Sequence, residues 1–198
     1  MSVFIKICGL SDAESAAAAV DAGADALGFV FAESVRKISP AQANAVVRTV
    51  SAHVQHVAVM RHPSNEEWQA VLDEFVPDVL QTDAEDFEGL DVPAHIRRWP
   101  VIREGNSAAT NELPEVFVYE GAHSGAGETV DWSRAAAIAG RGRMILAGGL
   151  AAENVAEAID TTKAWGVDVS SGVESQPGQK DVGLIRQFIG AVRAAEKG

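Results

Sequence analysis

Chemically useful residues follow short hydrophobic runs of this 198-residue sequence, starting with its lone cysteine. Cys8 ends the run that begins at Val3, and Lys6 stands two positions before it. A neighbouring cation favours the thiolate, which is the reactive form of cysteine. A lone cysteine is more often a small buried apolar residue. Its place at the end of an expected strand nevertheless favours a chemical role, and we predict that Lys6 contributes to the same substrate site.

Two segments near the C-terminal end are candidates for a phosphate site. The first contains Gly148 and Gly149, and the second contains Ser170, Ser171 and Gly172. Glycine lets backbone N–H groups approach a phosphate closely, and serine hydroxyls add hydrogen-bond donors. Turns need glycine in any case, so the prediction rests on the two segments together. No Gly-Lys-Ser/Thr triplet follows either segment, which disfavours a nucleoside triphosphate.

A carboxyl group, Glu120, ends another hydrophobic run and precedes a polar stretch that reaches Glu128. This stretch is either a plain connection or a loop that carries a lid or an acid. The histidines do not predict a metal site, because His53 and His56 would face opposite sides of an expected strand and the others are scattered.

Composition limits the partners and the compartment. The formal net charge is −12, with 28 acidic and 16 basic residues and no basic patch, which argues against nucleic acid as a partner. The single cysteine excludes an internal disulfide and fits a reducing compartment. The first ten residues carry Lys6 within a short apolar run, unlike a signal peptide or a membrane helix. We therefore expect a cytoplasmic protein without a membrane partner, and either a monomer or a homodimer.

Short β-branched runs alternate with alanine-rich helical patterns along the whole chain, which is typical of repeated βα units. The eight expected strands are Val3 to Ile7, Ala26 to Phe31, Val54 to Met60, Asp78 to Gln81, Pro100 to Arg103, Val116 to Tyr119, Met144 to Leu146 and Val167 to Ser170. The clearest helix is expected over Ser11 to Ala22, with Ser11 as N-cap and Glu14 completing a capping box. Further helices are expected to begin at Ser39, Ser64, Asp131, Ala151 and Asp181.

Near-continuous apolar strands indicate a parallel sheet that helices cover on both faces, in one domain of residues 1–198. The pattern leaves open whether the sheet closes into a (β/α)8 TIM barrel or stays a doubly wound open sheet. Both architectures place function at the carboxyl ends of the strands, where the candidate residues collect.

Several motifs run nearly end to end through the sequence with a characteristic order and spacing. They are Lys6-Ile7-Cys8-Gly9-Leu10, Ala22 to Phe31, Ser34 to Pro40, Gly125 to Trp132, Ala147 to Leu150, Glu153 to Val155, Asp168 to Glu174 and Pro177 to Asp181. In these motifs the sequence resembles the phosphoribosylanthranilate isomerase family.

The resemblance implies a single closed (β/α)8 barrel and an isomerase of tryptophan biosynthesis that performs an Amadori rearrangement on a phosphosugar without a metal or organic cofactor. It implies that Cys8 is the general base and that Arg36 holds the anthranilate carboxylate, a task that suits the guanidinium fork. The two glycine- and serine-containing segments would bind the 5'-phosphate.

Two departures from the family concern the general acid. The family ordinarily ends its sixth strand with an aspartate, and Glu120 stands at or near that position with a shorter loop after it. After the fourth strand, the usual Gln-Leu-His-Gly is replaced by Gln81-Thr82-Asp83-Ala84. We predict Glu120 as the acid, and Asp83 is the alternative.

Two other functions remain open from the sequence. An isomerase that also accepts the bisphosphorylated substrate of histidine biosynthesis needs a second phosphate loop after the third strand, and the segment Met60 to Asn65 contains no glycine. The altered strand ends also permit a catalytically weakened phosphosugar-binding barrel, in which Cys8 is idle.

Overall fold

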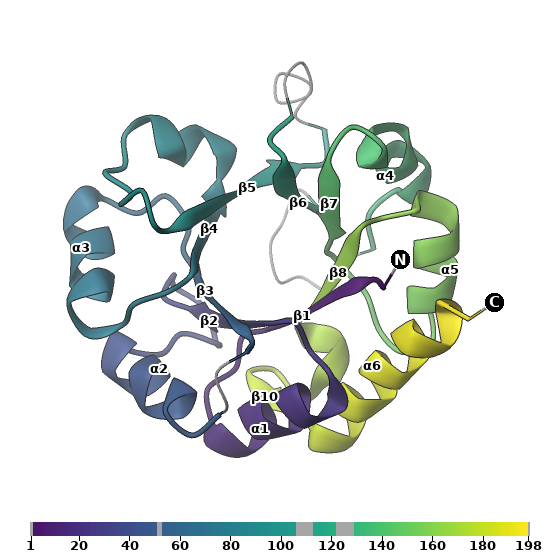
Figure 1. Cartoon of the computed structure of the whole chain (residues 1–198), viewed down its shortest axis with the longest axis horizontal. Helices are drawn as coiled ribbons and strands as arrows, with labels where there is room; N and C mark the ends of the chain where they lie inside the picture. The colour runs from purple at the N-terminus through teal and green to yellow at the C-terminus, as the bar shows by residue number, and fades with distance from the viewer. Residues whose placement is uncertain (1, 51–52, 106–112, 122–128, 198) are drawn as a thin grey trace.

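Eight parallel strands close into a barrel in the computed structural model, which describes residues 2–50, 53–105, 113–121 and 129–197 (Figure 1). The strands follow one another around the barrel in chain order, and β8 pairs with β1 to close it. They are β1 (Phe4–Cys8), β2 (Ala26–Val30), β3 (Gln55–Val59), β4 (Val79–Asp83), β5 (Arg97–Arg103), β6 (Val116–Glu120), β7 (Arg143–Leu146) and β8 (Gly166–Val169). The closure confirms the expected TIM barrel and excludes the open sheet.

Helices form the outer layer around the barrel (Figure 1). Those in the described residues are α1 (Ala13–Ala22), α2 (Pro40–Val47), α3 (Asn65–Glu74), α4 (Trp132–Ala139), α5 (Val155–Thr162) and α6 (Val182–Ala195). Between β4 and β5 the chain forms a 3-10 helix, Ala84–Glu88, in place of an α-helix. After β8, a 3-10 turn (Ser171–Val173) leads into a small hairpin of β9 (Glu174–Gln176) and β10 (Gln179–Lys180). The last helix, α6, packs beside α1 and so joins the two ends of the chain.

Side-chain caps define most helix starts as the sequence predicts. Ser39 and Ser64 form capping boxes, and Asp131 and Asp181 accept backbone N–H groups of the first turns of α4 and α6. Each cap satisfies a donor that the helix itself leaves without a partner. These four helix starts are confirmed.

Two predicted helix starts are wrong, and side-chain hydrogen bonds explain both. The N-cap of α1 is Asp12 rather than Ser11, because the Asp12 carboxylate accepts the N–H of Ser15 at 2.8 Å. Helix α5 begins at Val155 rather than at Ala151. The side chain of Asn154 accepts the Ala151 N–H at 2.8 Å and therefore folds that turn back before the helix starts.

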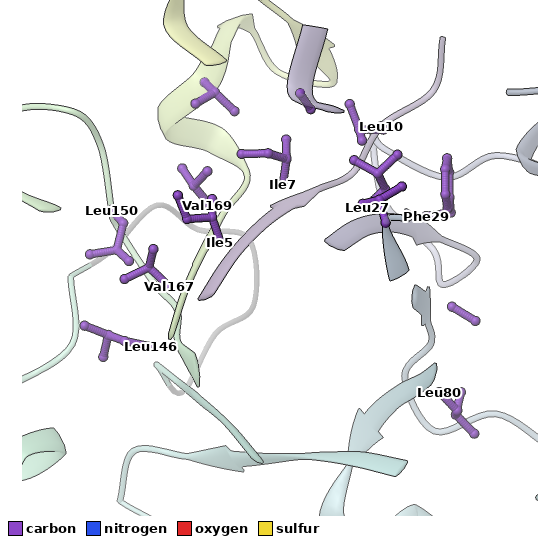
Figure 2. Close-up of a cluster of buried hydrophobic side chains, with 14 of the residues drawn as sticks. Ile5, Ile7, Leu10, Leu27, Phe29, Leu80, Leu146, Leu150, Val167 and Val169 are labelled. Atoms are coloured by element: carbon purple, nitrogen blue, oxygen red, sulfur yellow. The ribbon is translucent and has the colours of Figure 1, made fainter. Parts of the chain in front are cut away.

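Residues of the barrel strands alternate between two apolar layers, as the period of two in a strand requires. In β1, Ile5 and Ile7 point outward into the layer between barrel and helices, where they lie near Leu27 and Val169 (Figure 2). The inner layer fills the barrel itself. Its buried members are Ala26, Val57, Val79, Trp99, Val101, Val118, Ile145 and Ala147.

Aromatic rings fill the end of the barrel where the strands begin. Phe4 stacks on Trp165 with ring centroids 4.6 Å apart and meets the edge of Trp99 at 5.7 Å. Such contacts add to the stabilisation that burial of the rings provides. With this end packed by large apolar side chains, the inward positions at the opposite end of the strands are left for polar residues.

Gly172 allows the loops after β7 and β8 to touch, because a Cβ atom there would lie 2.0 Å from the carbonyl oxygen of Leu150.

We expect Gly172→Ala to lower the free energy of unfolding by about 1–3 kcal/mol, since an added methyl group in a filled space forces backbone shifts. The measurement is urea unfolding. The control is Gly190→Ala within α6, where a Cβ meets nothing within 4 Å and alanine is expected to raise the free energy of unfolding slightly. Equal effects of the two substitutions would contradict this account.

Candidate active site

A cavity of about 300 Å³ opens at the carboxyl ends of the strands, the face where barrel enzymes place their active sites. The predicted site residues on its wall are Cys8, Arg36, Glu120, Gly148, Gly149, Ser170 and Ser171. The cavity therefore brings together most of the residues that the sequence singles out.

Cys8 is the last residue of β1, and its side chain reaches the cavity although the residue is only 8% exposed. The neighbouring position on β2 is Gly28, where a Cβ atom would lie 2.9 Å from the cysteine sulfur. The absent side chain thus leaves room for the thiol. Burial raises the pKa of Cys8, and the cation of Lys6 acts in the opposite direction without outweighing it. The expectation that nearby positive charge favours the thiolate is therefore correct in sign but smaller than the effect of burial.

Lys6 lies beneath the cavity in a buried ion pair. Its Nζ is 2.7 Å from Oδ2 of Asp168, and the two side chains are 0% and 7% exposed. Burial acts to lower the pKa of Lys6, but the Asp168 carboxylate and Cys8 outweigh it and raise the pKa, so the ammonium stays charged. Lys6 was predicted to bind substrate. In the structure its ammonium group is paired with Asp168 and lies close to Cys8, and Lys6 is not among the residues that line the cavity.

Removing the cation should leave a buried carboxylate without a counter-charge. We expect Lys6→Met to lower the free energy of unfolding by about 3–5 kcal/mol, measured by urea unfolding, and Lys6→Met/Asp168→Asn to recover part of the loss. The matched control is Lys163→Met, which breaks an ion pair to Asp160 whose side chains are 75% and 85% exposed, and should change stability little. A Lys6→Met protein as stable as the control would contradict the importance of the buried pair.

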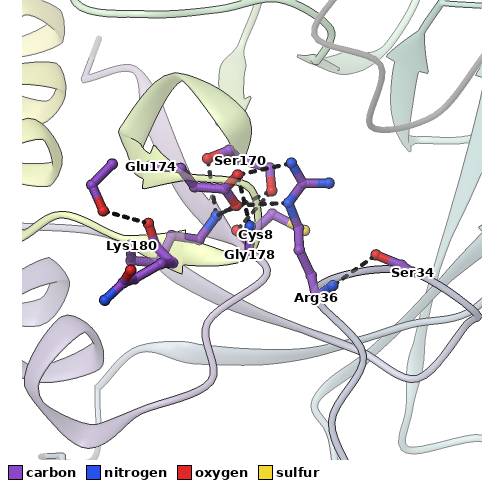
Figure 3. Close-up of polar contacts among 9 residues, drawn as sticks. Cys8, Ser34, Arg36, Ser170, Glu174, Gly178 and Lys180 are labelled. Carbon is purple, nitrogen blue, oxygen red and sulfur yellow. Dashed lines mark hydrogen bonds and ion pairs between the residues drawn. The ribbon is translucent and has the colours of Figure 1, made fainter.

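Arg36 reaches the cavity from the loop between β2 and α2 and is held by Glu174 (Figure 3). Its Nε and Nη2 donate to the two carboxylate oxygens at 2.7 and 2.9 Å. Lys180 donates to the same carboxylate at 2.7 Å, and to the carbonyl and hydroxyl oxygens of Ser170 at 2.9 and 3.2 Å. The Ser170 hydroxyl in turn donates to the carbonyl of Cys8 at 3.1 Å. This network connects the candidate carboxylate-binding residue, the candidate phosphate loop and the cysteine.

Glu174 should make stability depend on pH. Burial acts to raise its pKa, but hydrogen bonds and charge from Arg36 and Lys180 outweigh this and lower it from 4.5 to about 2. Because the folded value is the lower one, the stabilisation is present above pH 4.5 and is lost as the pH falls towards 2.

We expect Glu174→Gln to lower the free energy of unfolding by on the order of 2 kcal/mol at pH 7, and the difference from wild type to shrink below pH 4.5. Urea unfolding at several pH values measures it. Glu157→Gln, at an exposed position of α5, is the control and should show no such convergence. A difference in the free energy of unfolding between Glu174→Gln and wild type that stays constant at every pH would contradict the lowered pKa of Glu174.

The two predicted phosphate segments lie on the same side of the cavity. Gly148 and Gly149 adopt positive φ angles of 92° and 61°, and both residues line the cavity with Ser170 and Ser171. Gly172, which was predicted to bind substrate with them, is not among the residues on the wall and lies against Leu150 where the two loops meet. The two segments are about twenty residues apart in the sequence, yet they are neighbours at the opening of the cavity.

The two carboxyl groups considered as the general acid occupy different environments. Glu120 lines the cavity, and its side chain is 17% exposed. Asp83 is 2% exposed, does not line the cavity, and forms an ion pair with Arg103 in which Nε and Oδ1 are 2.6 Å apart. The predicted lid and acid loop at residues 122–128 lies outside the described residues.

One cluster of possible metal ligands was not predicted from the sequence. Ligand atoms of His62, Asp83 and Asp86 lie within 4.8 Å of one another. Arg103 already engages both oxygens of Asp83, at 2.6 and 3.1 Å, and a bound guanidinium disfavours a second cation there. The cluster is better described as part of an ionic chain than as a metal centre.

Three further residues that were not predicted from the sequence, Gln81, Arg103 and Asp168, also line the cavity. Gln81 and Arg103 stand two residues after the inward apolar residues Val79 and Val101, and Asp168 stands two residues after Gly166 in β8. The period of two was the signal that could have found them.

Comparison with known proteins identifies the family. The family model for N-(5'phosphoribosyl)anthranilate (PRA) isomerase matches residues 5–191. The chain belongs to the phosphoribosylanthranilate isomerase family. It is 39% identical over 199 residues to the N-(5'-phosphoribosyl)anthranilate isomerase of Pelobacter propionicus, with 93% of each chain covered. It is 36% identical over 220 residues to that of Bordetella pertussis, with 100% of this chain and 99% of the relative covered.

Solved phosphoribosylanthranilate isomerases share the fold. The enzyme from Thermus thermophilus superposes with a TM-score of 0.84 at 27% identity, covering 97% of this chain and 99% of that one. A second structure, at 32% identity and a TM-score of 0.80 with the same coverage, is a complex with reduced 1-(o-carboxyphenylamino)-1-deoxyribulose 5-phosphate. A third shows monomers generated from the dimeric enzyme of Thermotoga maritima, at 31% identity, a TM-score of 0.79 and the same coverage.

These comparisons confirm the predicted phosphoribosylanthranilate isomerase of tryptophan biosynthesis and its (β/α)8 fold. None of the helices in the described part of the chain combines the length and apolar character that crossing a lipid bilayer requires.

Proposed function

We propose that this isomerase converts N-(5'-phosphoribosyl)anthranilate to 1-(2-carboxyphenylamino)-1-deoxyribulose 5-phosphate with Glu120 as general acid and Cys8 as general base. The observation that carries the proposal is the shared cavity. The carboxyl group, the thiol and both candidate phosphate loops line a single space of about 300 Å³. A phosphosugar held at the loops therefore lies within one compartment with both groups.

The acid acts first. The Glu120 carboxyl group gives its proton to the ring oxygen of the furanose while the bond between C1' and that oxygen breaks, and the bonding electrons stay on oxygen. The lone pair of the anthranilate nitrogen forms the C1'–N double bond of an iminium ion. A carboxyl group placed within hydrogen-bond reach of the leaving oxygen contributes roughly 10²- to 10⁴-fold to such a step.

The base acts second. The Cys8 thiolate removes the proton from C2', and the electrons of the broken C–H bond form a C1'–C2' double bond and neutralise the iminium. The enolamine then tautomerises to the ketone. Because burial raises the pKa of the thiol, its thiolate is a stronger base but a smaller fraction of the protein at neutral pH. Lys6 offsets part of that loss, and no step requires a metal or an organic cofactor.

Binding groups complete the proposal. Glu174 fixes one edge of the Arg36 guanidinium, which leaves the remaining N–H groups for the anthranilate carboxylate. The loops at Gly148–Gly149 and Ser170–Ser171 present backbone and hydroxyl donors to the 5'-phosphate. The buried cation of Lys6 serves the thiol rather than the substrate directly.

Glu120 is favoured over Asp83 as the acid because of their surroundings. The Asp83 side chain is only 2% exposed, and its carboxylate forms an ion pair with the Arg103 guanidinium. Asp83 is therefore occupied by the guanidinium and does not line the cavity in which the substrate would lie. Glu120 reaches the cavity and can meet the substrate.

Two substitutions test the assignment. We expect Cys8→Ala and Glu120→Gln each to lower kcat by roughly 10²- to 10⁴-fold with little change in KM, because each removes a proton-transfer group rather than a binding group. The measurement is conversion of N-(5'-phosphoribosyl)anthranilate under steady-state conditions, with complementation of a tryptophan auxotroph as a second readout. Glu120→Gln with turnover near wild type would remove Glu120 from the mechanism. Growth with neither wild type nor Cys8→Ala would favour the weakened phosphosugar-binding barrel.

Acceptance of a second, bisphosphorylated aminoaldose is the other open function. The loop after β3 contributes Met60 and Arg61 to the cavity wall but contains no glycine for close approach to a second phosphate. We therefore propose a preference for the tryptophan-pathway substrate, and an assay of both aminoaldoses under equal conditions checks it.

We further propose that residues 1–198 act as one (β/α)8 domain in the cytoplasm, without nucleic acid or membrane partners. The closed barrel from β1 to β8 supports the single domain, and the lone cysteine supports a reducing compartment. The dimeric relative supports a homodimer as one outcome and a monomer as the other. Sedimentation analysis separates the two states.

A further inference from the structure

Arg103 stands between two carboxylates at the cavity. On one side, Nε and Nη2 of its guanidinium meet Oδ1 and Oδ2 of Asp83 at 2.6 and 3.1 Å. The Nη2 contact is a hydrogen bond, and the Nε contact adds the attraction of opposite charges, so Asp83 holds the guanidinium in place. The Asp83 side chain is 2% exposed, so the anchor itself has little freedom to move.

The remaining nitrogen of Arg103 faces the candidate acid. Nη1 lies 3.6 Å from Oε2 of Glu120 and donates to the carbonyl oxygen of Gly121 at 3.4 Å. Arg103 and Glu120 are register partners on β5 and β6, and the N–H of Glu104 donates to the carbonyl of Glu120 at 2.8 Å. The backbone and the guanidinium therefore both contribute to where the Glu120 carboxyl group points.

Asp83 is also approached from the loop after β3. Nε2 of His62 lies 3.6 Å from Oδ2 of Asp83, while Nδ1 of His62 contacts Asp86 at 2.9 Å. Thr82 donates its hydroxyl hydrogen to Asp86 at 2.5 Å. The chain of contacts thus runs Asp86, His62, Asp83, Arg103, Glu120 across strands β4, β5 and β6.

The order of charges in this chain has a consequence for catalysis. An isolated guanidinium next to Glu120 would favour the carboxylate form, which cannot act as an acid. Asp83 supplies a negative charge on the other side of Arg103 and so offsets the cation. Arg103 can then contact Glu120 while part of its positive charge is offset by Asp83.

We propose that Arg103 is a positioning residue for Glu120, and that Asp83, by holding and neutralising Arg103, keeps Glu120 able to give up a proton in the working pH range. The inference rests on the proposed role of Glu120 as the general acid. It explains together the two positions at which this chain departs from its family, Glu120 at the end of β6 and Asp83 at the end of β4. Glutamate places the carboxyl group one methylene further along its side chain, and the Asp83–Arg103 pair gives that longer side chain a fixed contact.

The experiment is the pH profile of kcat, which reports groups of the substrate complex. Asp83→Asn removes the neutralising charge and keeps the side-chain shape. We expect the alkaline fall of kcat to move to lower pH by about 0.5 to 1 unit, because an uncompensated cation near a carboxyl group favours its ionised form. Arg103→Gln should move the fall in the opposite direction, to higher pH. It should also lower kcat by roughly 10- to 100-fold through misplacement of the carboxyl group.

Two further variants separate charge from position and guard against loss of the fold. Arg103→Lys keeps the charge but not the fork, so we expect an alkaline fall near that of wild type together with a reduced kcat. Asp83→Asn/Arg103→Gln removes both charges and avoids an unpaired buried carboxylate, so its alkaline fall should lie between those of the two single variants and near that of wild type. Urea unfolding of each variant verifies the folded state.

The profile also contains other titrating and charged groups. Those that line the cavity with Glu120 are Cys8, Glu33, Arg36, Arg61 and Asp168, and Glu104 stands next to Arg103 in the chain. These groups are common to all variants and cancel in the comparison. His62 contacts both Asp83 and Asp86, so His62→Gln is included as a second background, in which the shift caused by Asp83→Asn should persist.

The matched control is Arg143→Gln. Arg143 begins β7 at the opposite end of the barrel and forms an exposed ion pair with Glu115. We expect its pH profile to match that of wild type. Shifts of the same sign in Asp83→Asn and Arg103→Gln, or no shift relative to Arg143→Gln, would overturn the inference.

Failure of the inference can be distinguished from failure of the proposed function by Glu120→Gln. If Glu120 is the acid, this variant loses the alkaline fall of kcat altogether. If the fall persists in Glu120→Gln, the acid assignment is wrong and the inference falls with it. If the fall disappears in Glu120→Gln but does not respond to Asp83→Asn, the acid assignment stands and the positioning role is rejected.

Discussion

The ion pair between Lys6 and Asp168 is the interaction on which the catalytic end of the barrel depends. The two residues are register partners on β1 and β8, so the pair lies across the seam where the first and last strands close the barrel. A buried lysine and a buried aspartate are tolerable only together, because each compensates the charge of the other. The pair also sets the charge beneath Cys8, and it thereby couples closure of the fold to the chemistry of the thiol.

The barrel interior is divided along its axis by physical character. Phe4, Trp99 and Trp165 pack the end where the strands begin, and small or branched apolar residues fill the middle. Polar side chains occupy the inward positions at the carboxyl ends. Each strand contributes few of them, so the cavity obtains its different chemical groups from many separate strands around a rigid, well-packed wall. A site built this way holds its groups in place before substrate arrives.

Charge pairing organises both sides of the cavity. On one side, Glu174 holds Arg36 and Lys180, which links the candidate phosphate loop to β1 through Ser170. On the other side, Asp83 holds Arg103 beside Glu120. In both cases a shielded carboxylate fixes an arginine by two contacts and leaves its remaining N–H groups for another purpose. Such anchoring limits the conformational freedom that a long cationic side chain would otherwise have to lose on binding.

Sequence patterns were enough to predict the alternating βα units, the approximate strands, four of the helix caps and the family. They also singled out Cys8, Arg36, Glu120 and the two loop segments, which share one cavity. These features are local, since they depend on hydrophobic periodicity, capping residues and motif order. The closure of the sheet, the burial of Lys6 against Asp168 and the ion pair between Asp83 and Arg103 became apparent only in the folded barrel. Those outcomes depend on which strands become neighbours and on the register between them, and residues far apart in the chain acquire their electrostatic partners only when the barrel has formed.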